Sequence, residues 1–202
     1  RNMTSLAVVA QVVVFHGTIG GLFFMRLRRR GWTWRQWLDP DGMALPTRLR
    51  QGAWLYLAMI PVVTAITWSW QALLQIVGFP IDPQFTVLLF TDEDTPRWLQ
   101  LFLGAWAVFI APPAEEMLFR GLALPLAARR FSLPVAVILV SLVFAGIHLH
   151  IPSFVPLFAV AGAFSLAAIG TGSLIPAIVM HAIFNAVNVA GVWWLAQHGM
   201  PS

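Results

Sequence analysis

The sequence predicts an all-α protein: a polytopic transmembrane helical domain with about six spans. Of its 202 residues, 59% are hydrophobic and only 10% are charged, whereas a soluble domain carries about 25% charged residues. The mean hydropathy is +0.79. The apolar residues form runs close to the roughly 20 residues that an α-helix needs to cross a bilayer. This composition favours an integral membrane protein with one membrane domain.

Short polar stretches divide the chain into six predicted spans. They are Met3–Met25, Gly52–Gly78, Trp98 to about Ala128, Phe131–Leu149, Ser153–Ile169 and Leu174–Gln197. The first is too long for a signal-peptide core and has no small-residue cleavage site. The chain opens on Arg1 rather than Met, which leaves room for membrane segments upstream. We divide it into residues 1–97, the N-terminal membrane spans with an Arg-rich loop, and residues 98–202, a membrane core that carries three polar motifs.

The charged residues predict how the spans are oriented. All twelve basic residues are arginines, and seven of them lie in residues 26–51. The positive-inside rule places that loop and Arg129-Arg130 in the cytoplasm, the acidic loop 79–97 and the turn at 150–153 outside, and the hinge at 170–173 inside. We read the basic charge as setting orientation, with no nucleic-acid partner. Cysteine is absent, which excludes disulfides and a thiol nucleophile.

Two adjacent glutamates, Glu115 and Glu116, lie inside the third span, although the chain has only three glutamates. A carboxylate at the centre of a membrane helix costs about 2.5–3.5 kcal/mol on insertion scales, so intramembrane ionisable residues indicate a functional site. Pro112-Pro113 interrupts the span and should place both acids in the first turn of a new helix. The structural alternative is that they only complement the helix dipole there.

Helical spacing separates the two carboxylates. Glu116 and Arg120 are four residues apart, so they share a helix face and can form an ion pair. Glu115 is rotated by about 100° from Glu116. We therefore predict that Glu116 and Arg120 are supporting residues and that Glu115 is free for chemistry.

Two later spans each carry a pair of residues spaced four apart, about one helical turn. These pairs are Phe144 with His148 and His181 with Asn185. A lone histidine on an apolar helix is usually structural. From residue 131 onward, however, histidines are the only ionisable side chains. Counting about 1.5 Å per residue from the span ends brings these side chains and Glu115 near mid-membrane. They are therefore expected to converge on one site, whereas His16 and His150 are given no role.

These residue types suit the hydrolysis of an acyl bond, most naturally a peptide bond. A carboxylate in a dry setting can act as general base on water, and histidine and asparagine can stabilise an oxyanion. No cofactor is predicted. Two histidines and a glutamate could also hold zinc, so a metal-dependent version stays open, although the His-Glu-x-x-His signature is absent.

The three motifs, taken in order, resemble those of the CAAX protease and bacteriocin-processing family, also called Abi proteins. They are Glu115-Glu116-x-x-x-Arg120, Phe144-x-x-x-His148 and His181-x-x-x-Asn185, within roughly residues 98–197. The resemblance implies an intramembrane peptidase of the type II CAAX prenyl endopeptidase kind. It also implies a membrane-embedded or lipidated peptide substrate, such as a prenylated CAAX tail. We expect the membrane to be a bacterial or archaeal plasma membrane.

The resemblance also implies a role for each motif residue. Glu115 would activate water and His148 would assist. His181 and Asn185 would form the oxyanion site, and Phe144 joins the supporting residues.

Two other classes of function stay open from the sequence. One is a non-enzymatic immunity or scaffold protein that binds a membrane peptide. The other is a transporter that uses Glu115, Glu116 and His148 as a proton path.

Overall fold

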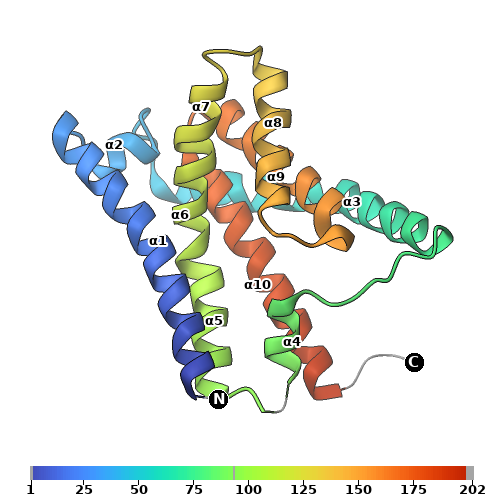
Figure 1. The fold of residues 1–202 in the computed structure, drawn as a ribbon. Helices are drawn as coiled ribbons and strands as arrows, with labels where there is room; N and C mark the ends of the chain where they lie inside the picture. Colours follow the sequence, from blue (N-terminus) through green and yellow to red (C-terminus); the bar gives the residue numbers. More distant parts are fainter. Residues whose placement is uncertain (1, 93, 199–202) are drawn as a thin grey trace.

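The computed structural model describes residues 2–92 and 94–198, and these residues form helices without a strand. The order is α1 (Asn2–Arg30), α2 (Trp34–Leu38), α3 (Leu45–Ile76), α4 (Phe85–Thr91), α5 (Arg97–Phe109), α6 (Ala111–Leu118), a π-helical turn η1 (Phe119–Ala123), α7 (Leu124–Ala127), α8 (Leu133–Gly146), α9 (Ile151–Thr171) and α10 (Leu174–His198). The predicted all-α class is confirmed (Figure 1).

The described residues provide four to five candidate membrane spans. Among the described residues, four helices are long and apolar enough to cross a bilayer: α1, α3, α9 and α10. The bent pair of Arg97–Phe109 with Ala111–Ala127 makes a fifth if it is counted as one span. Helix α8 has 14 residues and is therefore about 21 Å long, short of the roughly 30 Å hydrocarbon core. The prediction of about six spans is therefore not confirmed.

Helix α8 is short because the backbone turns inside the predicted span Phe131–Leu149. The amide of His148 bonds the Ala145 carbonyl, three residues back, and Leu149 has a left-handed φ of 49°. Figure 1 shows the α8–α9 turn between the two ends of the molecule, whereas the sequence placed it at the outer end. His148 therefore lies in this turn, after the end of α8, and is exposed.

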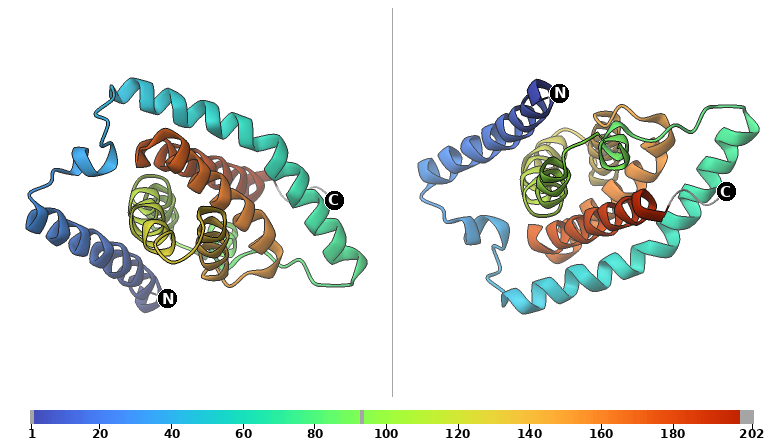
Figure 2. Two further views of the ribbon diagram at one scale, coloured as in Figure 1. Left: turned by 90° about the horizontal axis from the view of Figure 1, so that it is seen from above. Right: turned by 90° about the horizontal axis from the view of Figure 1, so that it is seen from below.

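Helices α1, α3 and α5 pack against α6, α9 and α10. Helix α1 packs on α6, and α3 packs on α9 and α10, so that α1 and α3 flank the bundle on opposite sides (Figure 2). The arginine-bearing end of α1 and the α7–α8 connection lie toward the same end of the molecule, as the charge pattern predicts (Figure 1). Large side chains such as Trp54, Trp68 and Leu166 remain exposed, which suits helices that face lipid.

A buried arginine joins the polar segment before α3 to the α9–α10 hinge. Arg48 is 1% exposed. It pairs with Asp39 at 2.6 Å and with Asp41 at 3.3 Å. Its Nη1 donates to the Thr171 carbonyl at 2.9 Å. The hinge itself needs a left-handed residue, which Gly172 supplies with a φ of 63°. The contacts of Arg48 with the two aspartates and the Thr171 carbonyl therefore fix the end of the bundle from which α10 starts.

Replacing Arg48 with methionine should destabilise the protein. The change leaves the buried Asp39 carboxylate without its cation, and breaking a buried pair in this way costs about 3–5 kcal/mol. The measurement is the free energy of unfolding in detergent. Arg50 is exposed and is the matched control, since Arg50→Met should change stability by less than about 0.5 kcal/mol. Equal effects of the two variants would contradict this assignment.

Candidate active site

The helix break between α5 and α6 follows from two adjacent prolines. Pro112 and Pro113 have no backbone N–H, so the carbonyls of Val108 and Phe109 lose their helical donors. Helix α5 ends at Phe109 and α6 starts at Ala111. The glutamates therefore lie in the second turn of α6, not in its first turn as the sequence predicted. The helix-dipole explanation of the two acids is weakened accordingly, because that effect fades beyond the first turn.

The ion pair predicted from spacing is formed. Arg120 Nη1 donates to Glu116 Oε1 at 2.9 Å, and both side chains are fully buried. Arg120 Nη2 donates to the Ala161 carbonyl and Nε donates to Ser165 Oγ. The guanidinium also lies over aromatic rings of Phe119, Phe144 and Phe164, at 5.9, 5.0 and 5.4 Å from their centroids. Arg120 is thus tied to α6, α9 and the α8 aromatic face.

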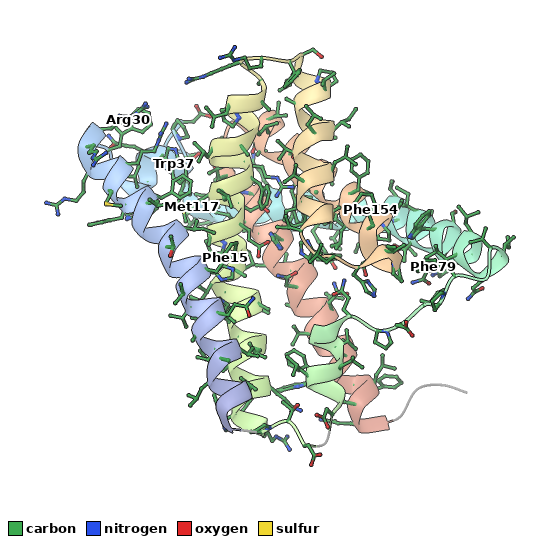
Figure 3. All side chains as sticks on the ribbon, viewed as in Figure 1. Phe15, Arg30, Trp37, Phe79, Met117 and Phe154 are labelled. Atoms are coloured by element: carbon green, nitrogen blue, oxygen red, sulfur yellow. The ribbon has the colours of Figure 1, made fainter. Side chains whose placement is uncertain are left out.

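A π-helical turn carries Arg120. Pro125 cannot donate to the Gly121 carbonyl, and the Leu124 amide donates to the carbonyl of Phe119, five residues back. Such π-bulges occur often at functional sites. Gly121, in the same turn, gives Trp37 of α2 room to approach, because a Cβ there would lie 2.6 Å from the indole ring. Figure 3 labels Trp37 and Met117, which pack together where α2 and α1 meet α6.

Glu115 is the carboxylate left outside the ion pair. Its side chain is 18% exposed, and its Oε2 lies 3.8 Å from His181 Nε2. Its Oε1 lies 3.6 Å from Nε2 of His16 on α1. Histidines from two separate helices, α1 and α10, therefore face one glutamate.

His181 is held in one orientation by the other glutamate. Its Nδ1 lies 2.8 Å from Glu116 Oε1, and because a carboxylate only accepts hydrogen bonds, Nδ1 must carry the proton. The ring stacks on Phe164 with centroids 5.0 Å apart. Its Nε2 is then directed at Glu115, and this nitrogen can donate a hydrogen bond only when the ring is an imidazolium.

His148 follows the end of α8 and is fixed by the helix that it terminates. Its Nδ1 lies 2.7 Å from the Phe144 carbonyl, so Nδ1 donates and Nε2 is left as an acceptor in the neutral ring. Phe144 is 1% exposed, and its ring contacts His148 and His181. Phe144 therefore positions both imidazoles through packing.

Asn185 lies one turn after His181 on α10. Its Nδ2 donates to the Ala107 carbonyl at 2.7 Å, near the end of α5, where helix carbonyls lack intrahelical partners. This contact gives Asn185 a structural function at the helix break. The structure does not test its predicted role toward an oxyanion.

The sequence analysis missed His16. An ionisable residue in the middle of the first span was a usable signal, but spacing along the chain could not connect it to Glu115. Among the described residues, no group of three or more histidine, aspartate or glutamate side chains has a metal-site arrangement. The zinc alternative therefore gains no support from the donor geometry.

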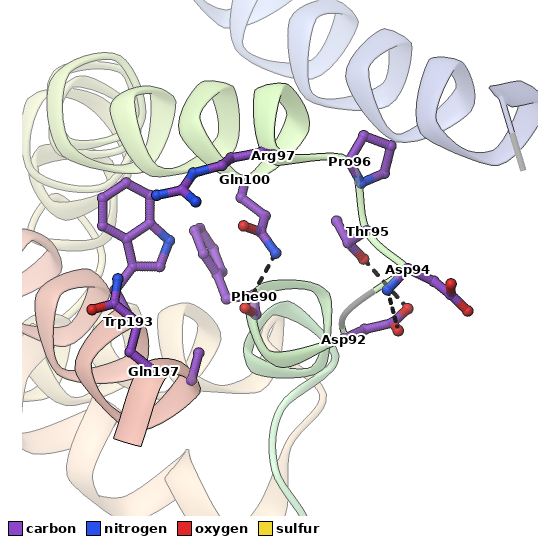
Figure 4. A pocket seen from close by; sticks show the side chains of 10 residues that line it. Phe90, Asp92, Asp94, Thr95, Pro96, Arg97, Gln100, Trp193 and Gln197 are labelled. Carbon is purple, nitrogen blue, oxygen red and sulfur yellow. Dashed lines mark hydrogen bonds between the residues drawn. The ribbon is translucent and has the colours of Figure 1, made fainter. Parts of the chain in front are cut away.

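A separate pocket of about 460 Å³ lies between α4, α5 and α10, at the end of the molecule away from this site (Figure 4). Asp92, Asp94, Arg97 and Trp193 are among its lining residues. Gln100 Nε2 donates across it to the Phe90 carbonyl at 3.3 Å. It contains none of the predicted site residues, and we do not assign it to the active site.

The fold and the site define a class: an integral membrane protein whose apolar helices enclose a cluster of carboxylates and imidazoles. Residues 96–187 match the family model described as Type II CAAX prenyl endopeptidase Rce1-like. The resemblance seen in the motifs is thereby confirmed. The family is one of CAAX-type intramembrane proteases. Comparison with curated proteins and with solved structures gives no match.

Proposed function

We propose that this protein is an intramembrane endopeptidase in which Glu115 activates the water that cleaves a peptide bond. The supporting observation is that Glu115 stays outside the buried Glu116–Arg120 pair and faces His181 at 3.8 Å. The substrate is a membrane-associated peptide of the prenylated CAAX type, since the family acts on such substrates. The membrane is the plasma membrane of a bacterium or archaeon.

The proposed reaction is a direct attack of water on the scissile carbonyl carbon. Glu115 takes one proton from the water as the carbon–oxygen bond forms. His148 Nε2, an acceptor in its neutral state, helps to orient that water. His181 and Asn185 stabilise the oxyanion of the tetrahedral intermediate by hydrogen bonding. The intermediate then breaks its carbon–nitrogen bond, the proton passes to the leaving amine, and a carboxylate and an amine result.

His181 can donate to an oxyanion only as an imidazolium, because Glu116 already holds its Nδ1 proton. Glu116 thus has two proposed functions: it neutralises Arg120 and it orients the His181 ring.

The test is cleavage-site mapping with purified protein in detergent. A synthetic peptide with a prenylated C-terminal CAAX tail and an unprenylated copy are each incubated with and without a chelator, and the products are identified by mass spectrometry. We expect the lipidated peptide to be cleaved both with and without the chelator. Absence of cleavage would contradict the proposed endopeptidase, and loss of cleavage with chelator would replace the glutamate mechanism by a metal-dependent one.

Replacing Asn185 with alanine separates its structural contact from its proposed chemical role. Loss of the bond to the Ala107 carbonyl should lower the free energy of unfolding by about 1 kcal/mol. Loss of an oxyanion donor should lower kcat by about 10²–10³-fold. Both quantities are measured on the same preparation, with the exposed Asn188→Ala as control. A stability loss with unchanged kcat would leave Asn185 a purely structural residue.

A further inference from the structure

His16 lies on α1, outside the residues 96–187 that match the family. Its side chain is 9% exposed. Its Nε2 is buried, has no hydrogen-bond partner within the described part of the chain, and lies 3.6 Å from Glu115 Oε1. Phe15, labelled in Figure 3, marks this level of α1 beside the bundle.

The face of α1 that carries His16 is already committed to α6. Ile19 and Phe23 follow His16 by three and seven residues, which places them on the same side of the helix. Both are buried in one cluster with Ala114 and Met117 of α6. Ala114 immediately precedes Glu115 in the chain, so the packing that holds α1 on α6 also holds His16 beside the carboxylate.

The other ring nitrogen determines where the His16 proton lies. Trp106 Nε1 lies 3.2 Å from His16 Nδ1, and an indole N–H only donates, so this bond requires an unprotonated Nδ1 and therefore a proton on Nε2. The Val12 carbonyl lies 2.9 Å from the same Nδ1 and would instead require a proton there. A neutral ring bonded to Val12 would turn a lone pair toward the Glu115 carboxylate, which is unfavourable. A neutral ring bonded to Trp106 and an imidazolium both avoid this.

We infer that His16 is a positioning residue for Glu115 whose Nε2 proton is directed at the carboxylate, and that Trp106 selects this orientation of the proton in the neutral ring. The inference rests on the proposed function and extends the site to α1. In both favourable states Nε2–H faces Oε1, which leaves Oε2, on the side of His181, to receive the proton from water. The 3.6 Å separation exceeds a hydrogen bond, but catalytic contacts are often long without substrate and shorten in the complex. An apolar residue would pack α1 on α6 without placing an ionisable group in the membrane.

The kinetic test compares variants that change the ring nitrogen but not the helix. His16→Phe keeps a planar side chain and removes Nε2–H, and a misplaced carboxylate should lower kcat by about 10²-fold with KM nearly unchanged. His16→Gln returns an N–H near the Nε2 position and should recover most of that loss. Val14→Ala, on the exposed side of α1, is the control, and thermal unfolding confirms that all variants fold. The inference is overturned if His16→Phe matches the control, if its loss lies in KM, or if His16→Gln is as slow as His16→Phe.

A second readout needs no substrate and therefore separates this inference from the proposed function. Nitrogen-15 NMR of labelled histidine distinguishes the two neutral tautomers and the imidazolium, and the His16 signal is identified by its loss in His16→Gln. We expect a protonated Nε2 in the native protein, a shift of that signal in Glu115→Gln, and a changed tautomer in Trp106→Phe. A neutral ring with its proton on Nδ1 in the native protein would overturn the inference even if the peptide is cleaved.

Discussion

Replacing Glu115 with glutamine should lower kcat for cleavage of a lipidated peptide by about 10²–10⁴-fold, the range that general acid–base catalysis contributes. Glutamine has nearly the same shape, so the packing around α6 is kept, but it cannot take a proton from water. KM should change little, because the carboxylate acts on water and not on the peptide. The measurement is the initial rate of product formation over a range of substrate concentrations.

Two matched variants make this prediction specific. Glu115→Asp keeps the charge but withdraws the carboxylate by one methylene, so its activity should fall between those of the native protein and Glu115→Gln. Asp82→Asn removes an exposed carboxylate on the loop between α3 and α4 and should leave kcat unchanged. Full cleavage by Glu115→Gln would rule out Glu115 as the base. Retention of a biological activity without cleavage would favour the scaffold or immunity class.

Residues that interact through neighbouring helical turns were predictable from the sequence. The Glu116–Arg120 pair follows from a spacing of four residues on one helix, and the formed bond confirms it. The hinge at 170–173 follows from glycines that can adopt a left-handed conformation, as Gly172 does. In both cases the cause lies within a few residues of chain, so the pattern and the structure agree.

Features that depend on contacts between distant segments were not predictable. The apolar run from Phe131 to Leu149 is long enough to be predicted as one span, although α8 ends at Gly146. The bond from Asn185 to the Ala107 carbonyl joins residues 78 positions apart. His16 and Glu115 are brought together only by the packing of α1 on α6. A helical period constrains one helix face and does not specify which face of another helix meets it.

The π-helical turn lies between these two cases. Pro125 is a local signal that the Gly121 carbonyl loses its donor. The sequence does not show whether the helix then breaks, bends or inserts a residue. Packing of Arg120 against Ala161 and Ser165 of α9 accompanies the π-turn and fixes the direction of the guanidinium. The proline therefore predicts where the helix becomes irregular. The contacts of Arg120 with α9 accompany the π-helical form that it takes there.

Replacing Arg120 with methionine should lower the free energy of unfolding by about 3–5 kcal/mol, since it leaves the Glu116 carboxylate buried without its cation. The variant also loses the hydrogen bonds to Ser165 and to the Ala161 carbonyl. Glu116→Gln should be milder, because an amide oxygen can still accept from Arg120 and from His181. The aromatic rings around Arg120 also stabilise an unpaired guanidinium. The measurement is unfolding in detergent followed by circular dichroism.

A double-mutant cycle tests whether the pair acts as a unit. Glu116→Gln combined with Arg120→Met removes both charges, so its loss of stability should be smaller than the sum of the single losses. The expected interaction energy is about 0.5–3 kcal/mol. Arg129 is exposed at the end of α7, and Arg129→Met should change stability by less than about 0.5 kcal/mol. Additive losses would mean that Glu116 and Arg120 are stabilised by separate partners. Glu116 would then interact with His181 but not be stabilised by Arg120. The assignment of Glu116 as the structural glutamate and Glu115 as the catalytic one would then not be supported by the stability data.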